Sequence, residues 1–251
     1  MMEMIKKNWG KIVLTSAVVL AASLAGGYGW VMPVVMLAAH LLCLLSAFGD
    51  KRIHTQSRKA LGILFWIMPV GSVLLAVISR ISESGADDDL ASLIMDCGLG
   101  FLFLVMGNYM PKFRQNGVIG IRVKWTLENE ENWAMTHRFA GKCLMIAGCC
   151  CILFAFLPLG MAGDLLCMAA ILIAVLIPGI YSWRYYKRQL QSGKVEKKPV
   201  SQKALIRGSI FAAVIIIFSV WVLFTGSMHM VYDKESFTIE TPDWKNLTIS
   251  Y

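Results

Sequence analysis

The sequence predicts an all-α integral membrane protein with about seven transmembrane helices, a polar cytoplasmic loop and a short extracytoplasmic tail of β-prone character. Two observations predict this class. The mean hydropathy is +0.62 and only 16% of residues are charged, whereas a soluble domain typically has about 25% charged residues. In addition, apolar runs long enough to cross about 30 Å of hydrocarbon recur along the chain.

Seven apolar runs are predicted to span the membrane. They cover residues 12–29, 30–48, 61–79, 90–107, 143–159, 165–183 and 206–224. The first two runs are nearly continuous, and only the glycine-rich stretch 26–29 offers a place to turn. Without that turn the two runs would merge, and the count would fall to six.

The distribution of Lys and Arg predicts the orientation, because these residues are retained on the cytoplasmic side. With the N-terminus inside and the C-terminus outside, 21 of the 24 basic residues fall in cytoplasmic segments. Only Arg80, Lys234 and Lys245 fall outside. The net charge of +8 is then explained by basic loops that rest on anionic inner-leaflet lipid, without direct contact with nucleic acid.

Five segments follow from the spans and the charges. They are a two-helix hairpin with a basic cytoplasmic loop (1–60), a membrane core (61–189), a cytoplasmic linker (190–205), a last transmembrane helix (206–225) and an extracytoplasmic tail (226–251).

The most informative stretch is a polar island at residues 107–142, between two long apolar runs. It is rich in Arg, Lys, Trp and Gly. Pro111, Gly117 and Gly120 predict a turn or loop in its first part.

The second part of the island predicts a short helix from about Asn129. Trp133, His137 and Ala140 follow one another at i, i+4 and i+7, which would lay this helix along the membrane surface. We interpret Trp125 and Trp133 as anchors at the headgroup level, with a partner-binding face as the alternative. For His137 we expect a structural or hydrogen-bonding role, because no second His lies at a metal-ligand spacing and no nucleophile lies nearby.

The polar island contains the pattern Gly107-Asn108-Tyr109, Pro111-Lys112, Arg114, Asn116, Ile119-Gly120-Ile121-Arg122, Trp125-Thr126-Leu127, Glu130-Glu131, Trp133 and Thr136-His137-Arg138. This pattern resembles the signature of the SdpI family, bacterial integral membrane proteins named for immunity to a secreted, membrane-active sporulation-delay toxin. Gln115, Gly117 and Val123-Lys124 depart from the family pattern. Of the matching residues, those taken as the candidate partner-binding site are Gly107, Asn108, Tyr109, Pro111, Lys112, Arg114, Gly120, Arg122, Trp125, Thr126, Glu130, Trp133, Thr136 and His137.

The resemblance implies a multi-pass immunity and signalling protein of the bacterial cytoplasmic membrane that gives resistance to a toxin peptide. It also implies that the protein holds a cytoplasmic transcriptional repressor at the membrane once toxin is engaged. The residues expected to contact a partner are Arg114, Arg122, Trp125, Trp133 and His137. In the family layout an external loop separates the first two spans. Here residues 26–30 replace it, so we expect toxin recognition through that loop to differ or to be absent.

Asp96, inside the fourth predicted span, keeps an alternative function open. An intramembrane carboxylate is costly and points to function, although at this depth it could also reach the headgroups or outer water. Together with the kinks predicted at Pro69 and Pro178, it indicates a small-solute transporter or channel. A purely structural membrane scaffold is a third class.

No enzyme activity, cofactor or metal site is predicted. The chain offers no nucleophile with a base at a usable spacing. Its seven cysteines all lie in or at the edges of apolar runs, without the gaps of a zinc or redox site, and are interpreted as small residues packed between helices.

Overall fold

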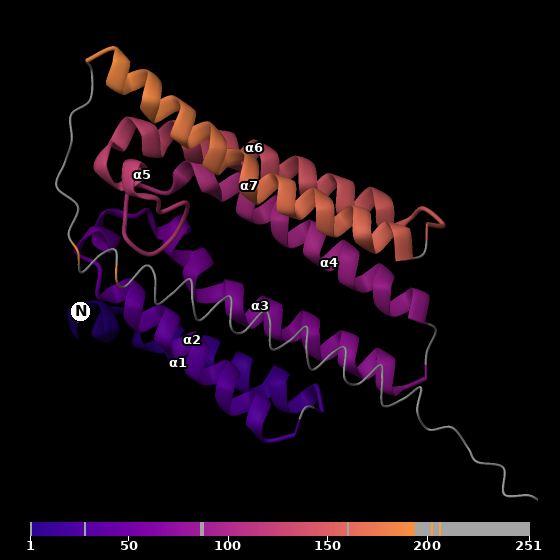
Figure 1. Ribbon diagram of the computed structural model, residues 1–251. Helices are drawn as coiled ribbons and strands as arrows, with labels where there is room; N and C mark the ends of the chain where they lie inside the picture. The colour runs from indigo at the N-terminus through magenta and orange to yellow at the C-terminus, as the bar shows by residue number, and fades with distance from the viewer. Residues whose placement is uncertain are drawn as a thin grey trace, which may run out of the picture. The chain divides into compact units, whose positions relative to one another are not determined.

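The computed structural model describes residues 2–27, 29–85, 88–159 and 161–193, together with the isolated positions 202 and 206. All regular secondary structure in these residues is helical. The helices are α1 (Met2–Ala25), α2 (Val31–Phe48), η1 (Lys51–Thr55), α3 (Arg58–Glu83), α4 (Asp88–Tyr109), η2 (Met110–Lys112), α5 (Lys124–Glu128), α6 (Glu130–Ala155) and α7 (Met161–Gln191) (Figure 1).

Six helices of the described part are long and apolar enough to cross a membrane, namely α1, α2, α3, α4, α6 and α7. The prediction of an all-α membrane protein is therefore confirmed. The seventh predicted span, at residues 206–224, lies outside the described residues except for position 206, and the β-prone tail lies wholly outside them.

The first two apolar runs form two separate helices. α1 ends at Ala25 and α2 begins at Val31. Between them Gly27 has a φ of +76° and Gly29 a φ of +67°, in the left-handed region that residues with a side chain rarely adopt. These two glycines allow the chain to reverse, so the runs do not merge into one span.

The membrane-length helices pack in two groups of three. α1 packs against α2 and α3, whereas α6 packs against α4 and α7, and contacts between α3 and α4 join the groups (Figure 1). Each group has its own buried apolar cluster. The first is built around Leu44, Phe48 and Phe65, and the second around Phe113 and Leu144.

Glycines bring α4 and α6 into backbone contact. A Cβ at Gly107 of α4 would lie 2.7 Å from the carbonyl oxygen of Gly141 of α6, and a Cβ at Gly148 would lie 2.6 Å from the carbonyl oxygen of Gly100. Small residues allow such close approach between membrane helices. Because the two contacts are about two turns apart on both helices, α4 and α6 stay close over that length.

A helix begins next to Asn129, as predicted, but the prediction that it is short and lies along the membrane surface is wrong. α6 runs without a break from Glu130 into the following apolar run, and the separate five-residue helix α5 precedes it. The side chain of Asn129 accepts a hydrogen bond of 2.8 Å from the backbone N–H of Asn132 and so caps α6. Hydropathy alone could not show this continuity, because the first turns of α6 are polar.

Candidate functional site

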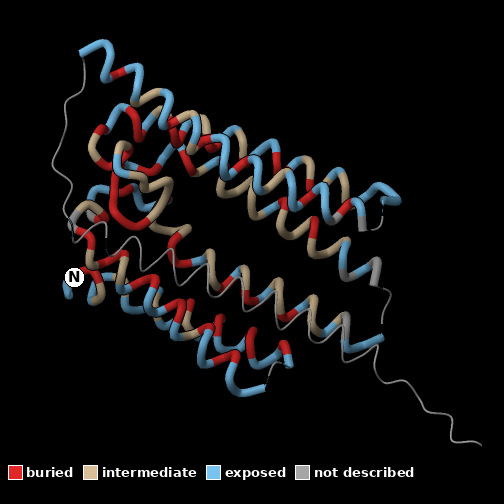
Figure 2. Tube along the Cα trace, viewed as in Figure 1, coloured by how far each residue is buried: buried red, intermediate tan, exposed pale blue. Residues whose placement is uncertain are grey.

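The loop at residues 113–123 folds inward between the two helix groups, and much of it is buried (Figure 2). Val118 is 1% exposed and belongs to the apolar cluster of the α1–α3 group. Ile119 packs against the clusters of both groups. The first part of the signature is therefore a packed structural element and not a loose connection.

Asn116 gives this loop its turn. Its Oδ1 accepts hydrogen bonds from the backbone N–H groups of Val118 at 2.8 Å and Ile119 at 2.7 Å, and its Nδ2 donates to the carbonyl oxygen of Arg114 at 2.8 Å. An Asn side chain that bonds to the backbone two or three residues away stabilises a tight turn. Asn116 is fully buried, so its side-chain atoms in these bonds are shielded from water.

The connection between α2 and α3 holds the loop from the other helix group. The Asp50 carboxylate accepts hydrogen bonds from the backbone N–H of Arg52 at 2.8 Å and from that of Gly117. The Arg52 guanidinium donates to Oε1 of Gln115 at 3.0 Å. We call Asp50, Arg52 and Gln56 the clamp.

Gln56, the third clamp residue, pairs with the backbone of Arg114. Its Nε2 donates to the Arg114 carbonyl oxygen at 2.8 Å, and its Oε1 accepts from the Arg114 N–H at 3.0 Å. The backbone of Arg114 is thus held at both polar groups, while its side chain is exposed. Sequence reasoning assigned the connection only a basic charge, and no local pattern could have indicated the clamp.

Gln115 joins the loop to α5. Its Nε2 donates to the carbonyl oxygens of Thr126 at 2.7 Å and Leu127 at 2.9 Å. The hydroxyl of Thr126 in turn donates to the carbonyl oxygen of Ile121 at 2.7 Å. Thr126 is fully buried and therefore has a structural role in this conformation.

Gly120 and His137 are in direct contact. Gly120 has a φ of +105°, and a Cβ at this position would overlap Nε2 of His137. That nitrogen accepts a hydrogen bond of 3.1 Å from the N–H of Ile121, while Nδ1 lies 2.8 Å from the carbonyl oxygen of Trp133. An N–H group facing Nε2 and a carbonyl facing Nδ1 select the neutral imidazole with its proton on Nδ1.

Trp133 is buried and does not reach a membrane surface. It is 1% exposed, its indole N–H donates to the carbonyl oxygen of Phe113 at 2.8 Å, and its ring stacks on His137 with a centroid separation of 4.0 Å. The interpretation of Trp133 as a headgroup anchor is therefore wrong. The periodicity of Trp133, His137 and Ala140 marks the face of α6 that is buried within the protein.

A buried polar cluster joins α6 to α7. The Ser182 hydroxyl donates to Oδ1 of Asn132 at 2.8 Å, and Asn132 Nδ2 donates to the Ser182 carbonyl oxygen at 3.1 Å. Thr136 donates to the same Oδ1 at 3.0 Å, and the half-buried Trp125 donates its indole N–H to Ser182 Oγ at 2.9 Å. Sequence reasoning missed Asn132 and Ser182. The only indication of these two residues in the sequence is that each is polar and lies within a long helix.

Glu128 of α5 and Glu131 of α6 accept hydrogen bonds from uncharged donors of α7. Tyr185 donates its hydroxyl to Glu131 at 2.7 Å, and Gln189 donates to the other oxygen of the same carboxylate at 2.9 Å. Tyr186 donates to Glu128 at 3.1 Å. The end of α7 is therefore fixed against the second half of the signature.

The predicted site divides into buried and accessible members. Gly107, Thr126, Trp133, Thr136 and His137 are buried; Tyr109, Gly120, Arg122 and Trp125 are partly buried; Asn108, Pro111, Lys112, Arg114 and Glu130 are exposed. Direct partner contact through Trp133 or His137 does not fit this conformation, because both side chains are enclosed by protein. Their hydrogen bonds shape the site that the accessible members present.

Arg122 is held close to the loop backbone. Its Nη1 donates to the carbonyl oxygen of Gly117 at 3.1 Å. Partial burial lowers the pKa of its guanidinium from the ordinary value, although an Arg side chain stays charged in proteins. A cation is thus retained at the inner edge of the exposed surface.

Asp96 is not part of the signature. It is 8% exposed in α4 and lies beside Cys151 of α6 and Cys167 of α7. Of the two alternatives left open for Asp96, this burial disfavours the one in which its side chain reaches the headgroups or outer water. Within the described part of the chain, no three His, Cys, Asp or Glu residues lie close enough together to hold a metal ion.

Membrane-length helices and a buried, hydrogen-bonded polar loop together define an integral membrane protein with a structured signature at one end of its helices. Residues 112–182 match the model of the SdpI/YfhL protein family. Immunity protein SdpI of Bacillus subtilis (strain 168) is 28% identical over 163 residues, covering 63% of this chain and 74% of that protein. Both comparisons confirm the resemblance to the SdpI family that residues 107–142 predicted. No solved structure matches the chain.

Proposed function

We propose that this protein is a non-enzymatic membrane immunity protein that protects a bacterial cell against a membrane-active toxin peptide. The similarity to Immunity protein SdpI over 63% of the chain carries this proposal. The protein would lie in the cytoplasmic membrane with its N-terminus inside and its C-terminus outside. This orientation puts 21 of the 24 basic residues on the side of the anionic inner leaflet.

The surface that we assign to partner binding is the accessible part of the signature, with Lys112, Arg114, Arg122 and Trp125 as its cationic and aromatic members. The clamp and the buried Asn116 hold the backbone beneath it. A binding surface on a fixed backbone loses little conformational freedom when a partner binds. We assign a second activity to the same surface, the capture of a cytoplasmic transcriptional repressor through protein contact and not through nucleic acid.

The proposal is tested by survival. Bacillus cells that lack their own immunity protein would express this chain and be challenged with sporulation-delay toxin peptide. We expect the chain to restore growth and Arg114→Ala to abolish protection, because this change removes an exposed cation whose backbone contacts stay in place. Arg58→Ala is the matched control, since Arg58 is an exposed Arg outside the signature, at the start of α3.

Membrane levels of each variant would be followed by immunoblot. Failure of the unaltered chain to protect would contradict immunity to this class of toxin. Full protection by Arg114→Ala at a normal level would show that this cation is not part of the partner surface.

A small-solute transporter or channel is the second candidate, favoured by the burial of Asp96 in a membrane-length helix. This candidate predicts a proton flux into dye-loaded proteoliposomes that Asp96→Asn abolishes while toxin resistance is kept. Loss of resistance in Asp96→Asn without any flux in the unaltered protein would exclude it. A purely structural scaffold predicts no effect on either readout.

A further inference from the structure

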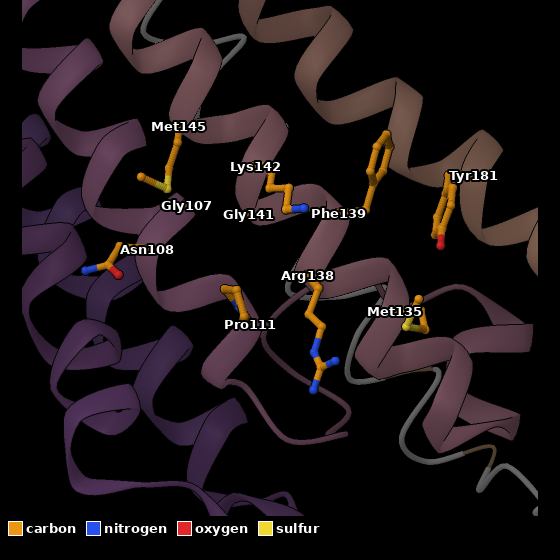
Figure 3. Close-up of a pocket in the computed structure, with 10 residues that line it drawn as sticks. All are labelled: Gly107, Asn108, Pro111, Met135, Arg138, Phe139, Gly141, Lys142, Met145 and Tyr181. Carbon is orange, nitrogen blue, oxygen red and sulfur yellow. The ribbon is translucent and has the colours of Figure 1, made fainter.

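A cleft of about 400 Å³ opens beside α6, and residues of α4, η2 and α7 complete its lining. Its lining includes Asn108 of α4, Pro111 of η2 and Tyr181 of α7 (Figure 3). Arg138 and Lys142 of α6 also line it. Because residues four apart on a helix lie on one face, these two cations can reach the same small ligand.

The charge of the cleft is unbalanced. No Asp or Glu is among its lining residues. Arg138 and Lys142 are both exposed, and the ion pairs found in the described part of the chain, Arg80–Glu83 and Lys124–Glu128, involve neither of them. Two cations without an acid complement a single anion with several acceptor oxygens, as in a phosphate group.

The remaining walls are apolar and aromatic. Phe139 and Tyr181 stack with a centroid separation of 4.6 Å. Met145, three positions after Lys142 on α6, is 43% exposed. Beyond Met145, the outward face of α6 continues with Ile146, which is 65% exposed, and Leu153, which is 58% exposed. A ligand that fills this surface needs an anionic head and a long apolar tail.

All three helices that line the cleft change from apolar to polar at its level. Lys142 is the last charged residue of α6 before the apolar run. On α4 the apolar run ends at Gly107, and on α7 the charged residues of the C-terminal end begin at Arg184, three positions after Tyr181. This transition marks the boundary between hydrocarbon and headgroups, where lipid phosphates lie.

We propose that the cleft binds one anionic phospholipid, with its phosphate between Arg138 and Lys142 and an acyl chain along Met145 and the outward face of α6. A zwitterionic lipid fits less well, because the lining offers no carboxylate for its ammonium group. The proposal rests on the membrane placement proposed above and specifies its lipid partner. It is independent of toxin immunity, since lipid binding and survival are measured separately.

The test is native mass spectrometry of the purified full chain in detergent, titrated with phosphatidylglycerol or phosphatidylcholine. We expect the unaltered protein to retain one phosphatidylglycerol in preference to phosphatidylcholine. The double variant Arg138→Gln/Lys142→Gln should lower the affinity for phosphatidylglycerol at least about tenfold, as expected for the loss of two cations beside one phosphate. Lys7→Gln/Lys11→Gln is the matched control, because it removes two exposed cations at the same spacing on α1. It should change the affinity by less than about twofold, since distant exposed charges are screened.

Two further measurements serve as controls. The first separates the effect of charge from an effect on folding, and the second distinguishes a bound lipid from a bound free anion. Arg138→Lys/Lys142→Arg keeps both charges and should retain lipid binding. Millimolar inorganic phosphate should not displace the lipid, and displacement would assign the cleft to a soluble anion. Equal affinity of the two Gln double variants for phosphatidylglycerol, or no preference over phosphatidylcholine, would overturn the proposal.

Discussion

Gly120 and His137 show how single residues of the signature depend on one another. The absence of a side chain at Gly120 leaves room for the imidazole, and the imidazole then accepts the N–H of Ile121. If this hydrogen bond were lost, either the imidazole nitrogen or the Ile121 N–H would be left without a partner. Such an unsatisfied buried polar group lowers the free energy of unfolding by about 1–3 kcal/mol. The two residues therefore act as one structural unit.

Gly120→Ala should lower stability by about 1–3 kcal/mol, because a side chain is strained at this φ and would overlap His137. The measurement is the thermal unfolding midpoint of the purified protein in detergent. Gly62→Ala is the control, since a Cβ at Gly62 in α3 meets no atom within 4 Å. Equal midpoints for the two variants would contradict the contact.

At the level of elements, the contact between α4 and α6 fixes the frame on which the signature is built. The loop leaves α4 just beyond Gly107 and returns, through α5, to α6 at Glu130. The distance between these two helices therefore sets the span that the loop has to bridge. Gly141 lies within that contact, close to the ring of Pro111 and the backbone of Gly107.

Gly141→Leu should separate α4 from α6 and reduce the amount of folded protein in the membrane. A Cβ at this position already meets the Gly107 carbonyl oxygen at 2.7 Å, and a backbone cannot yield as a flexible side chain can. The readout is the membrane level by immunoblot together with thermal unfolding. Gly71→Leu is the control, because a Cβ at Gly71 in α3 meets nothing within 4 Å. A normal level and midpoint for Gly141→Leu would argue against close packing.

Hydropathy predicted which described segments form membrane-length helices, but not the residues at which those helices begin and end. α1 begins at Met2, ten residues before the first apolar run at 12–29, and α7 continues to Gln191. Polar turns at helix ends keep the helical hydrogen bonds of the backbone while leaving the hydrocarbon, so hydropathy does not detect them. The same limit explains why the start of α6 was predicted to be a short helix along the membrane surface.

The residue pattern of the signature predicted the family match, but it did not show which of its side chains are buried. The pattern identified Trp133 and His137 but not the burial of their side chains, because an aromatic or histidine pattern looks the same on a buried face and at a membrane surface. The clamp was not predictable at all. Gln56 and Arg114 are 58 positions apart, and no local periodicity relates them.

On the scale of the whole molecule, successive membrane-length helices run in alternating directions. As a result, one end of the described helices holds the start of α1, the α2–α3 connection, the signature and the end of α7 (Figure 1). The hydrogen bonds between the clamp and residues 114–117 show directly that two of these segments meet. Both segments are basic, which is the reason to expect this end in the cytoplasm.

A reporter active only outside the cytoplasm should be silent when fused at Gln191 and active when fused after Tyr251, which lies beyond the described residues. Gln191 ends α7 on the basic side, and the predicted seventh span would carry the C-terminus across the membrane. Alkaline phosphatase activity in intact cells is the measurement, and a cytoplasmic reporter at the same two sites is the complement. An inside C-terminus would contradict the seventh span.

The clamp has a consequence for exchanging parts between relatives. The segment that matches the family model begins at residue 112, whereas Asp50, Arg52 and Gln56 lie upstream of it. Suppose that a chimera receives only residues 107–142 from a relative. The side chains of its α2–α3 connection would then not match the hydrogen-bonding groups of the new loop. Transplanting residues 50–56 together with the loop would transfer both hydrogen-bonding partners. Recombination experiments should therefore exchange these two segments together.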